Sequence, residues 1–228
     1  MFENFIQIAG VKNREEAELL IHCGVRYLGF PLRLPVHKED LSEDEASEII
    51  RFLPPGVQGV LITYLDRADE IARFCEELGV KLVQLHGDIS ADELSHLKKI
   101  SPQLKIIKSL IVRENNLPQL ERLTETFGML VDAFITDTYD PQTGASGATG
   151  RVHDWAVSRR LVEISPKPLI LAGGLNPANV GEAILQVRPA GVDSHTGVED
   201  AAGRKDPLLV KEFLAGADSS FRQIGKKR

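Results

Sequence analysis

The sequence has little of what redox, disulfide or metal chemistry requires. Only two of its 228 residues are cysteines, Cys23 and Cys75, and they lie far apart in the chain. Neither belongs to a CxxC pair or a Cys/His cluster, the spacings that bind zinc or form redox centres. Cys75 falls on the apolar stripe of a predicted helix, and Cys23 immediately precedes the helix-ending Gly24. We therefore expect both thiols to be buried and reduced, and we expect no metal and no cofactor.

Long hydrophobic runs and positive charge are also scarce. No apolar stretch reaches the roughly 18 residues of a membrane-spanning helix, and no charged-then-apolar leader opens the chain. The net charge at pH 7 is −6, and the basic run at residues 222–228 is most simply a frayed terminus. We therefore expect no nucleic-acid partner and no membrane partner, and we expect a cytoplasmic protein.

What the chain does contain is a regular alternation of strand and helix signals. Hydrophobic residues make up 43% of it and charged residues 26%, which is enough to build a sizeable core. The predicted strands are near-continuous apolar runs, as is typical of parallel strands covered on both faces. They comprise residues 5–11, 25–30, 57–65, 80–87, 104–112, 130–137, 168–174 and 191–197.

Helix starts between these runs are well marked. Three capping-box patterns, each with a glutamate three residues after the cap, begin at Asn13, Ser42 and Ser90. Asn176, followed by proline at the first helical position, opens another helix. Eight βα units in a chain of this length predict one (β/α)8 TIM barrel domain over residues 1–228. A doubly wound open sheet is the alternative, but it normally needs fewer units and a first-turn glycine fingerprint, which is missing.

In such a barrel the working residues lie where strands end and loops begin. The strand ends here read 8-IAG-10, 29-GFP-31, 84-QLHG-87, 135-ITDT-138, 172-AGGLNPANV-180 and 193-DSHTGVE-199. In that order they resemble phosphoribosylanthranilate isomerases, the Amadori-rearranging barrels of tryptophan biosynthesis. The resemblance runs nearly end to end and includes 153-HDW-155 and 171-LAGGLNPANV-180, then 196-TGVE-199 followed by Gly203, Lys205 and Asp206. It implies an isomerase of the intramolecular oxidoreductase type acting on a phosphorylated small molecule, as a monomer or homodimer.

The ends of the last two predicted strands favour a phosphate site. Gly173 and Gly174 let backbone approach a ligand where a Cβ would clash, and Leu175 follows them. Thr196 and Gly197 end the neighbouring strand, and barrels of this type commonly hold a phosphate between these two strands. The simpler alternative is that the glycines only make a tight turn. We interpret these five residues as a phosphate-binding site.

Asp137 ends the sixth predicted strand and matches the general acid that the resemblance implies, which protonates the ribose ring oxygen. A carboxyl group at the mouth of an apolar barrel has its pKa raised by desolvation, so it holds a donatable proton. The alternative is that Asp137 only caps the turn-rich segment 137–144. Gln84 and His86 match a pair beside the active site and are candidate substrate-binding residues.

Two other features near the mouth have a less direct role. We expect Lys108 to be a charge at the barrel rim or mouth rather than a Schiff-base lysine. We expect the glycine-spaced loop 143–150 to act as a lid over the substrate.

The sequence departs from the family pattern at two positions, one that acts on the sugar and one that binds the anthranilate carboxylate. Ala9 stands where the resemblance places a cysteine whose thiolate removes the C2 proton. Val36 stands where it places an arginine that meets the anthranilate carboxylate, and Arg33 or His37 are candidates to replace that cation. The eighth strand introduces His195, which with Asp140 is a candidate substitute base.

These departures leave three functions open. The first is an isomerase of phosphoribosylanthranilate with a substitute base. Because residue 9 carries no thiol, we expect turnover of this substrate to be weak or absent. The second is a related acid–base isomerase or epimerase of another phosphorylated sugar. The third is a phosphosugar-binding protein without turnover.

Overall fold

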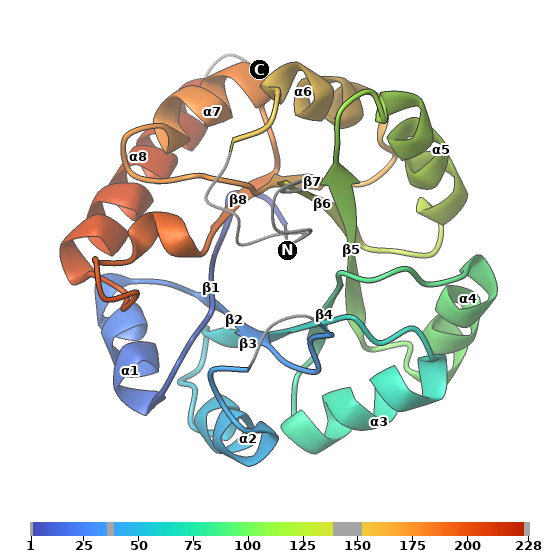
Figure 1. The fold of residues 1–228 in the computed structure, drawn as a ribbon, viewed down its shortest axis with the longest axis horizontal. Helices are drawn as coiled ribbons and strands as arrows, with labels where there is room; N and C mark the ends of the chain where they lie inside the picture. The colour runs from blue at the N-terminus through green and yellow to red at the C-terminus, as the bar shows by residue number, and fades with distance from the viewer. Residues whose placement is uncertain (1, 36–38, 139–151, 226–228) are drawn as a thin grey trace.

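The structure is a computed structural model that describes residues 2–35, 39–138 and 152–225. Over these ranges eight parallel strands close into a barrel in the order β1 to β8, surrounded by a ring of helices (Figure 1). The predicted TIM barrel is therefore confirmed. The strands are β1 (Phe5–Ala9), β2 (Tyr27–Pro31), β3 (Gln58–Thr63), β4 (Leu82–Leu85), β5 (Lys105–Val112), β6 (Ala133–Thr138), β7 (Leu169–Leu171) and β8 (Gly191–Ser194).

The helices begin largely where the capping signals placed them. They are α1 (Arg14–Cys23), α2 (Glu43–Arg51), α3 (Ala68–Leu78), α4 (Ala91–Ile100), α5 (Leu117–Phe127), α6 (Trp155–Ile164), α7 (Val180–Val187) and α8 (Pro207–Gly225), with a short 3₁₀ helix, η1, at Thr196–Val198. Asn13, Ser42 and Ser90 each accept a hydrogen bond from the backbone N–H three residues on. Of these three, Ser42 alone forms the reciprocal capping box. The helix predicted from Asn176 begins later, at Val180, because a turn on the Asn176 side chain precedes it.

All eight strands are shorter than predicted, and the shortening matters most for the site at β7 and β8. β7 ends at Leu171 rather than residue 174, because Gly173 and Gly174 take left-handed φ angles of 98° and 64° that leave the extended conformation. β8 ends at Ser194, and the chain continues as η1. The segment predicted to bind phosphate is therefore loop and 3₁₀ helix rather than strand.

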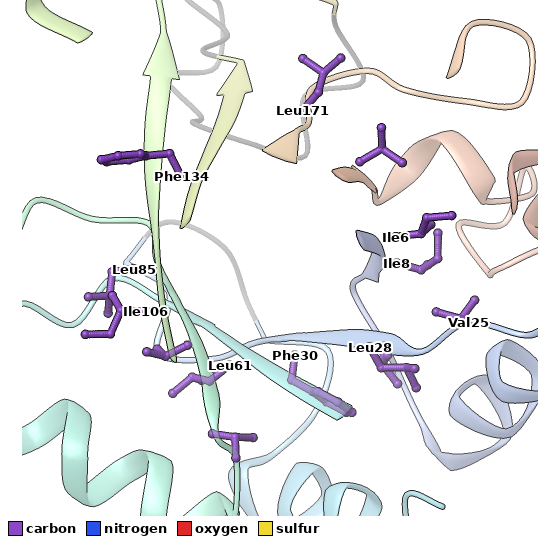
Figure 2. Packing of buried hydrophobic residues seen from close by; sticks show 14 of the residues in the cluster. Ile6, Ile8, Val25, Leu28, Phe30, Leu61, Leu85, Ile106, Phe134 and Leu171 are labelled. Atoms are coloured by element: carbon purple, nitrogen blue, oxygen red, sulfur yellow. The ribbon is translucent and has the colours of Figure 1, made fainter. Parts of the chain in front are cut away.

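Strand alternation produces two separate hydrophobic clusters. One fills the barrel interior and comprises Phe2, Phe5, Ala9, Val60, Ile62, Leu82, Ile107, Ala133, Ile135, Ile170 and Ala172. The other lies between strands and helices, and Figure 2 shows part of it, including Leu28, Ile106 and Phe134. Because successive side chains along a strand point to opposite faces, membership of the inner cluster identifies which strand-end residues face the barrel mouth.

The two cysteines differ in burial. Cys75 is buried within α3 as predicted, but Cys23, at the end of α1, is only half-buried. Within the described ranges, no helix is both long and apolar enough to cross a bilayer. The same ranges contain no cluster of His, Cys, Asp and Glu able to hold a metal ion.

Candidate active site

A layer of polar side chains covers the apolar barrel interior at the carboxyl ends of the strands. This polar layer consists of Gln7, Gln84, Ser109, Asp137 and Asp193, all of them buried. Gln7 Nε2 donates to Gln84 Oε1 at 3.0 Å, and Gln84 Nε2 donates to Ser109 Oγ at 3.4 Å. The layer therefore links β1, β4 and β5 across the barrel.

Asp137 and Asp193 stand level with each other in this layer. Ile170 on β7 pairs with Ile135 on β6 and with Gly191 on β8. Two residues further along, the same three strands carry Asp137, Ala172 and Asp193. The two carboxyl groups therefore flank a single small residue, and their charges interact.

Burial makes both carboxyl groups weaker acids than usual. It raises the pKa of Asp137 to about 7, against the hydrogen bond that Thr138 N–H donates to Oδ1 at 2.8 Å. It also raises the pKa of Asp193 to about 7, and the negative charge of Asp137 acts in the same direction. The hydrogen bond from Gln7 and the charge of Lys205 oppose this rise. Near neutral pH both groups are therefore part-protonated, and Asp137 has the environment that the sequence predicted for it.

The end of β1 lies against His195. Ala9 is buried in the inner cluster, and a Cβ added to Gly10 would collide with the His195 imidazole ring. Burial, helped by Lys205 and Lys12, lowers the pKa of His195 to about 3. The ring is therefore neutral under physiological conditions and lies next to the end of β1 that carries Ala9.

The tops of β7 and β8 are in direct contact, as the phosphate prediction requires. Ser194 Oγ donates to the Leu175 carbonyl at 2.8 Å, and a Cβ on Gly197 would collide with the same carbonyl. Asn179 Nδ2 donates to the Gly174 carbonyl at 3.0 Å. These contacts bring Gly173, Gly174 and Leu175 beside Thr196 and Gly197.

The His-Asp-Trp motif has a structural role beside the β7 loop, because its histidine bonds to other side chains of the fold. His153 Nδ1 lies 3.1 Å from Thr138 Oγ1, and its Nε2 lies 2.6 Å from Ser158 Oγ. Thr138 in turn occupies the space beside Gly173 that a Cβ there would need. Burial lowers the pKa of His153 to about 4, so a neutral ring joins β6 to α6.

The Arg33 side chain is already paired with other residues, so it does not present a free cation to a substrate carboxylate. Its guanidinium pairs with Glu43 at 2.8 Å and with Glu70 at 3.0 Å. It also stacks on the Phe74 ring, 3.7 Å from the centroid. The side chain is thus held between α2 and α3, which the sequence did not reveal because its partners lie 10 and 37 residues away. The other cation candidate, His37, lies outside the described residues, as do Asp140 and the predicted lid.

The polar side chains at the end of β4 face the barrel mouth, whereas Lys108 on the neighbouring β5 does not. Gln84 belongs to the polar layer, and His86 Nδ1 lies 3.1 Å from Ser109 Oγ, so both predicted substrate contacts meet Ser109 in that layer. Lys108, however, is buried on the outward face of β5. Its Nζ donates to the carbonyls of Leu85, Gly87 and Ser109. The prediction of a rim charge is wrong, because this lysine fastens the loop after β4.

Comparison with known proteins agrees with this geometry. The family model for N-(5'-phosphoribosyl)anthranilate isomerase matches residues 6–215. The chain is 40% identical over 220 residues to N-(5'-phosphoribosyl)anthranilate isomerase 2 of Methanosarcina mazei, covering 96% of each protein. It is 35% identical to the isomerase of Methanothrix thermoacetophila, covering 92% of this chain and 95% of that protein.

Solved structures give the same result. The phosphoribosylanthranilate isomerase of Thermotoga maritima superposes with a TM-score of 0.79 at 28% identity, covering 95% of this chain and 99% of that one. A phosphoribosylanthranilate isomerase in complex with reduced 1-(o-carboxyphenylamino)-1-deoxyribulose 5-phosphate gives 0.77 at 27% identity, with the same two coverages.

The raised pKa of Asp137 predicts a pH-dependent gain in stability for Asp137→Asn. The folded protein holds a proton that the unfolded chain releases between pH about 4 and about 7, so this carboxyl destabilises the fold increasingly over that range. We expect the variant's advantage over wild type in urea unfolding to be small at pH 4 and to reach roughly 1–4 kcal/mol at pH 8. The exposed Asp218→Asn serves as the control, and an advantage that does not change with pH would contradict the assignment.

The contact between β7 and β8 predicts a large effect of Gly197→Ala. The new methyl group meets the backbone carbonyl of Leu175, which moves only with the loop. We expect a loss of roughly 1–3 kcal/mol in unfolding free energy and a weaker thermal shift with inorganic phosphate. Gly225→Ala, where a Cβ meets no neighbouring atom within 4 Å, is the matched control; equal stability of the two variants would refute the close approach.

Proposed function

Because the chain belongs to the N-(5'-phosphoribosyl)anthranilate isomerase family, we propose that it catalyses the Amadori rearrangement of N-(5'-phosphoribosyl)anthranilate in tryptophan biosynthesis. The observation that carries the proposal is Asp137, a buried carboxyl group in the barrel mouth that holds a proton near neutral pH. An isomerase of the intramolecular oxidoreductase type is the function that this site and the family support together, and we propose that it acts in the cytoplasm.

In the proposed reaction Asp137 acts as general acid. Its proton passes to the ribose ring oxygen as the bond from that oxygen to C1 breaks, and the anthranilate nitrogen forms a double bond to C1. A pKa near the working pH suits this step, because the group is both protonated often enough and acidic enough to donate. Gln84 and His86 lie in or beside the polar layer, where they face the opened sugar.

The phosphate of the substrate is assigned to Gly173, Gly174, Leu175, Thr196 and Gly197. Support comes from the contact between the two segments and from the left-handed backbone of Gly173 and Gly174, which only glycine adopts readily. The related isomerase structure with a 5-phosphate ligand agrees with a phosphorylated substrate.

The base is the unusual part of the proposal. Ala9 cannot accept a proton, so another group must remove the one on C2. His195 as this base stays a prediction: its ring is neutral and close to Gly10. Ala9 also favours a second candidate function, isomerisation of another phosphorylated sugar.

Turnover of N-(5'-phosphoribosyl)anthranilate tests the proposal directly. We expect measurable activity in the wild type and a fall of about 10²–10⁴-fold in kcat for Asp137→Asn, because the general acid is lost while the side-chain shape is kept. The assay follows the disappearance of substrate fluorescence, and complementation of a tryptophan auxotroph lacking this isomerase provides a second readout. Failure of both in the wild type, together with stabilisation by other sugar phosphates, would favour the second candidate.

Restoring a thiol tests the meaning of Ala9. If no other residue supplies an equivalent base, we expect Ala9→Cys to raise turnover by up to about 10²-fold, because a well-placed base contributes that much. Ala9→Ser, of similar size but without an accessible anion, is the control. A wild type already as fast as ordinary members of the family, with no gain from Ala9→Cys, would show that residue 9 is not where a base is missing.

A further inference from the structure

We infer that Asp193, on β8, is the catalytic base that removes the C2 proton in this protein. The inference rests on the proposed isomerase function and assigns a role to a residue that the sequence patterns did not single out. It places both proton-transfer groups of the reaction on carboxyl side chains in one layer of the barrel mouth.

The strand register places Asp193 beside the vacant thiol position. Gln7 on β1 pairs with Asp193 on β8, and Ala9 lies two residues beyond Gln7 on the same inward face. Asp193 is therefore on the strand next to Ala9 and one inward step below it. Alanine is the smallest side chain that has a Cβ, so residue 9 covers the Asp193 carboxyl group as little as such a side chain can.

Asp193 also has an oxygen that nothing else in the described residues uses. Its Oδ1 is fully buried and has no hydrogen-bond partner there, and the same is true of Gln7 Oε1. Buried acceptors are normally paired, so two of them in one corner of a site call for an explanation. A proton arriving on Asp193 supplies the missing donor, which is what a general base acquires during its reaction.

The charges around Asp193 suit a base that must later give its proton away. Asp137 faces it from β6 and raises its proton affinity, while Gln7 from β1 and Lys205 from the loop before α8 lower it. Burial has the largest effect and brings its pKa to about 7. His195, whose pKa is about 3, is a much weaker proton acceptor.

The proton balance closes within the pair. Asp137 gives its proton to the ring oxygen, and ionised Asp193 takes the proton from C2. The C–H electron pair then forms the C1–C2 double bond, and the electrons of the C1–nitrogen double bond return to nitrogen. The resulting enol loses its hydroxyl proton and gains one at C1 through water, giving the ketone. Asp193 is left protonated and Asp137 ionised, and transfer of that proton from Asp193 to Asp137 through water restores the starting state.

A rescue experiment tests the assignment. Wild type, Asp193→Asn, Ala9→Cys and the double variant Ala9→Cys with Asp193→Asn are assayed with N-(5'-phosphoribosyl)anthranilate, with Asp218→Asn as the control. We expect Asp193→Asn to lower kcat by about 10²–10⁴-fold and the double variant to recover at least tenfold of that loss, because the thiol replaces the carboxylate. The limb of the pH–rate profile that reports the base is expected to shift from near 7 toward that of a thiol in the double variant.

Each other outcome overturns the inference in a distinguishable way. Asp193→Asn with at least a third of wild-type kcat shows that Asp193 is not the base. A loss of kcat that Ala9→Cys does not rescue, in a variant as stable as wild type, assigns Asp193 a structural role. If His195→Gln loses kcat while Asp193→Asn retains it, the base is the imidazole. A wild type without any turnover overturns the proposed function itself, and this inference with it.

Discussion

Burying two carboxyl groups above an apolar barrel interior is the constraint on which this site depends. The inner cluster beneath Asp137 and Asp193 is hydrophobic on every strand that contributes to it, so water does not solvate the carboxylates from below. Desolvation of that kind disfavours the charged form. The other members of the polar layer, Gln7, Gln84 and Ser109, are neutral amides and a hydroxyl. None of them is a cation that could pair with the carboxylates and offset their desolvation. The acid strength of the site is therefore a property of the fold rather than of one neighbouring residue.

A separate group of charges holds the loops around this mouth in place. Lys205, whose side chain is fully buried, donates to the His195 carbonyl and to Glu199, both at 2.9 Å. Lys12 donates to the Gly203 carbonyl, and Glu16 accepts from the Lys205 backbone N–H at 2.9 Å. These bonds join the loop after β1 to the loop after β8. Glu199 and Lys205 therefore help to hold the first and last strands together.

Much of the fold was predictable because local signals and barrel geometry agree. Apolar runs gave the strands, Asn13 and Ser42 gave helix starts, and the glycines after β7 marked a loop where backbone is exposed. Asp137 was predictable because it stands at a strand end. Asp193 and Gln7 were harder to recognise, since their importance depends on which face of the strand points inward and on register with a neighbouring strand. Arg33 misled because its ion pairs bridge two helices that approach only in the folded protein.

Ala9 has a consequence for the chemical robustness of the protein. The thiolate form of cysteine is readily oxidised, and a catalytic thiol exposed to peroxide is converted stepwise to acids that cannot act as a base. The two cysteines of this chain lie in α1 and α3, away from the polar layer. Burial raises the pKa of Cys75 to about 12 and raises that of Cys23 above its usual value, so both thiols stay protonated and unreactive. The proton-transfer groups proposed for this barrel, Asp137 and Asp193, are carboxyl groups, which that oxidation does not convert; oxidative stress that inactivates a catalytic cysteine would leave them intact.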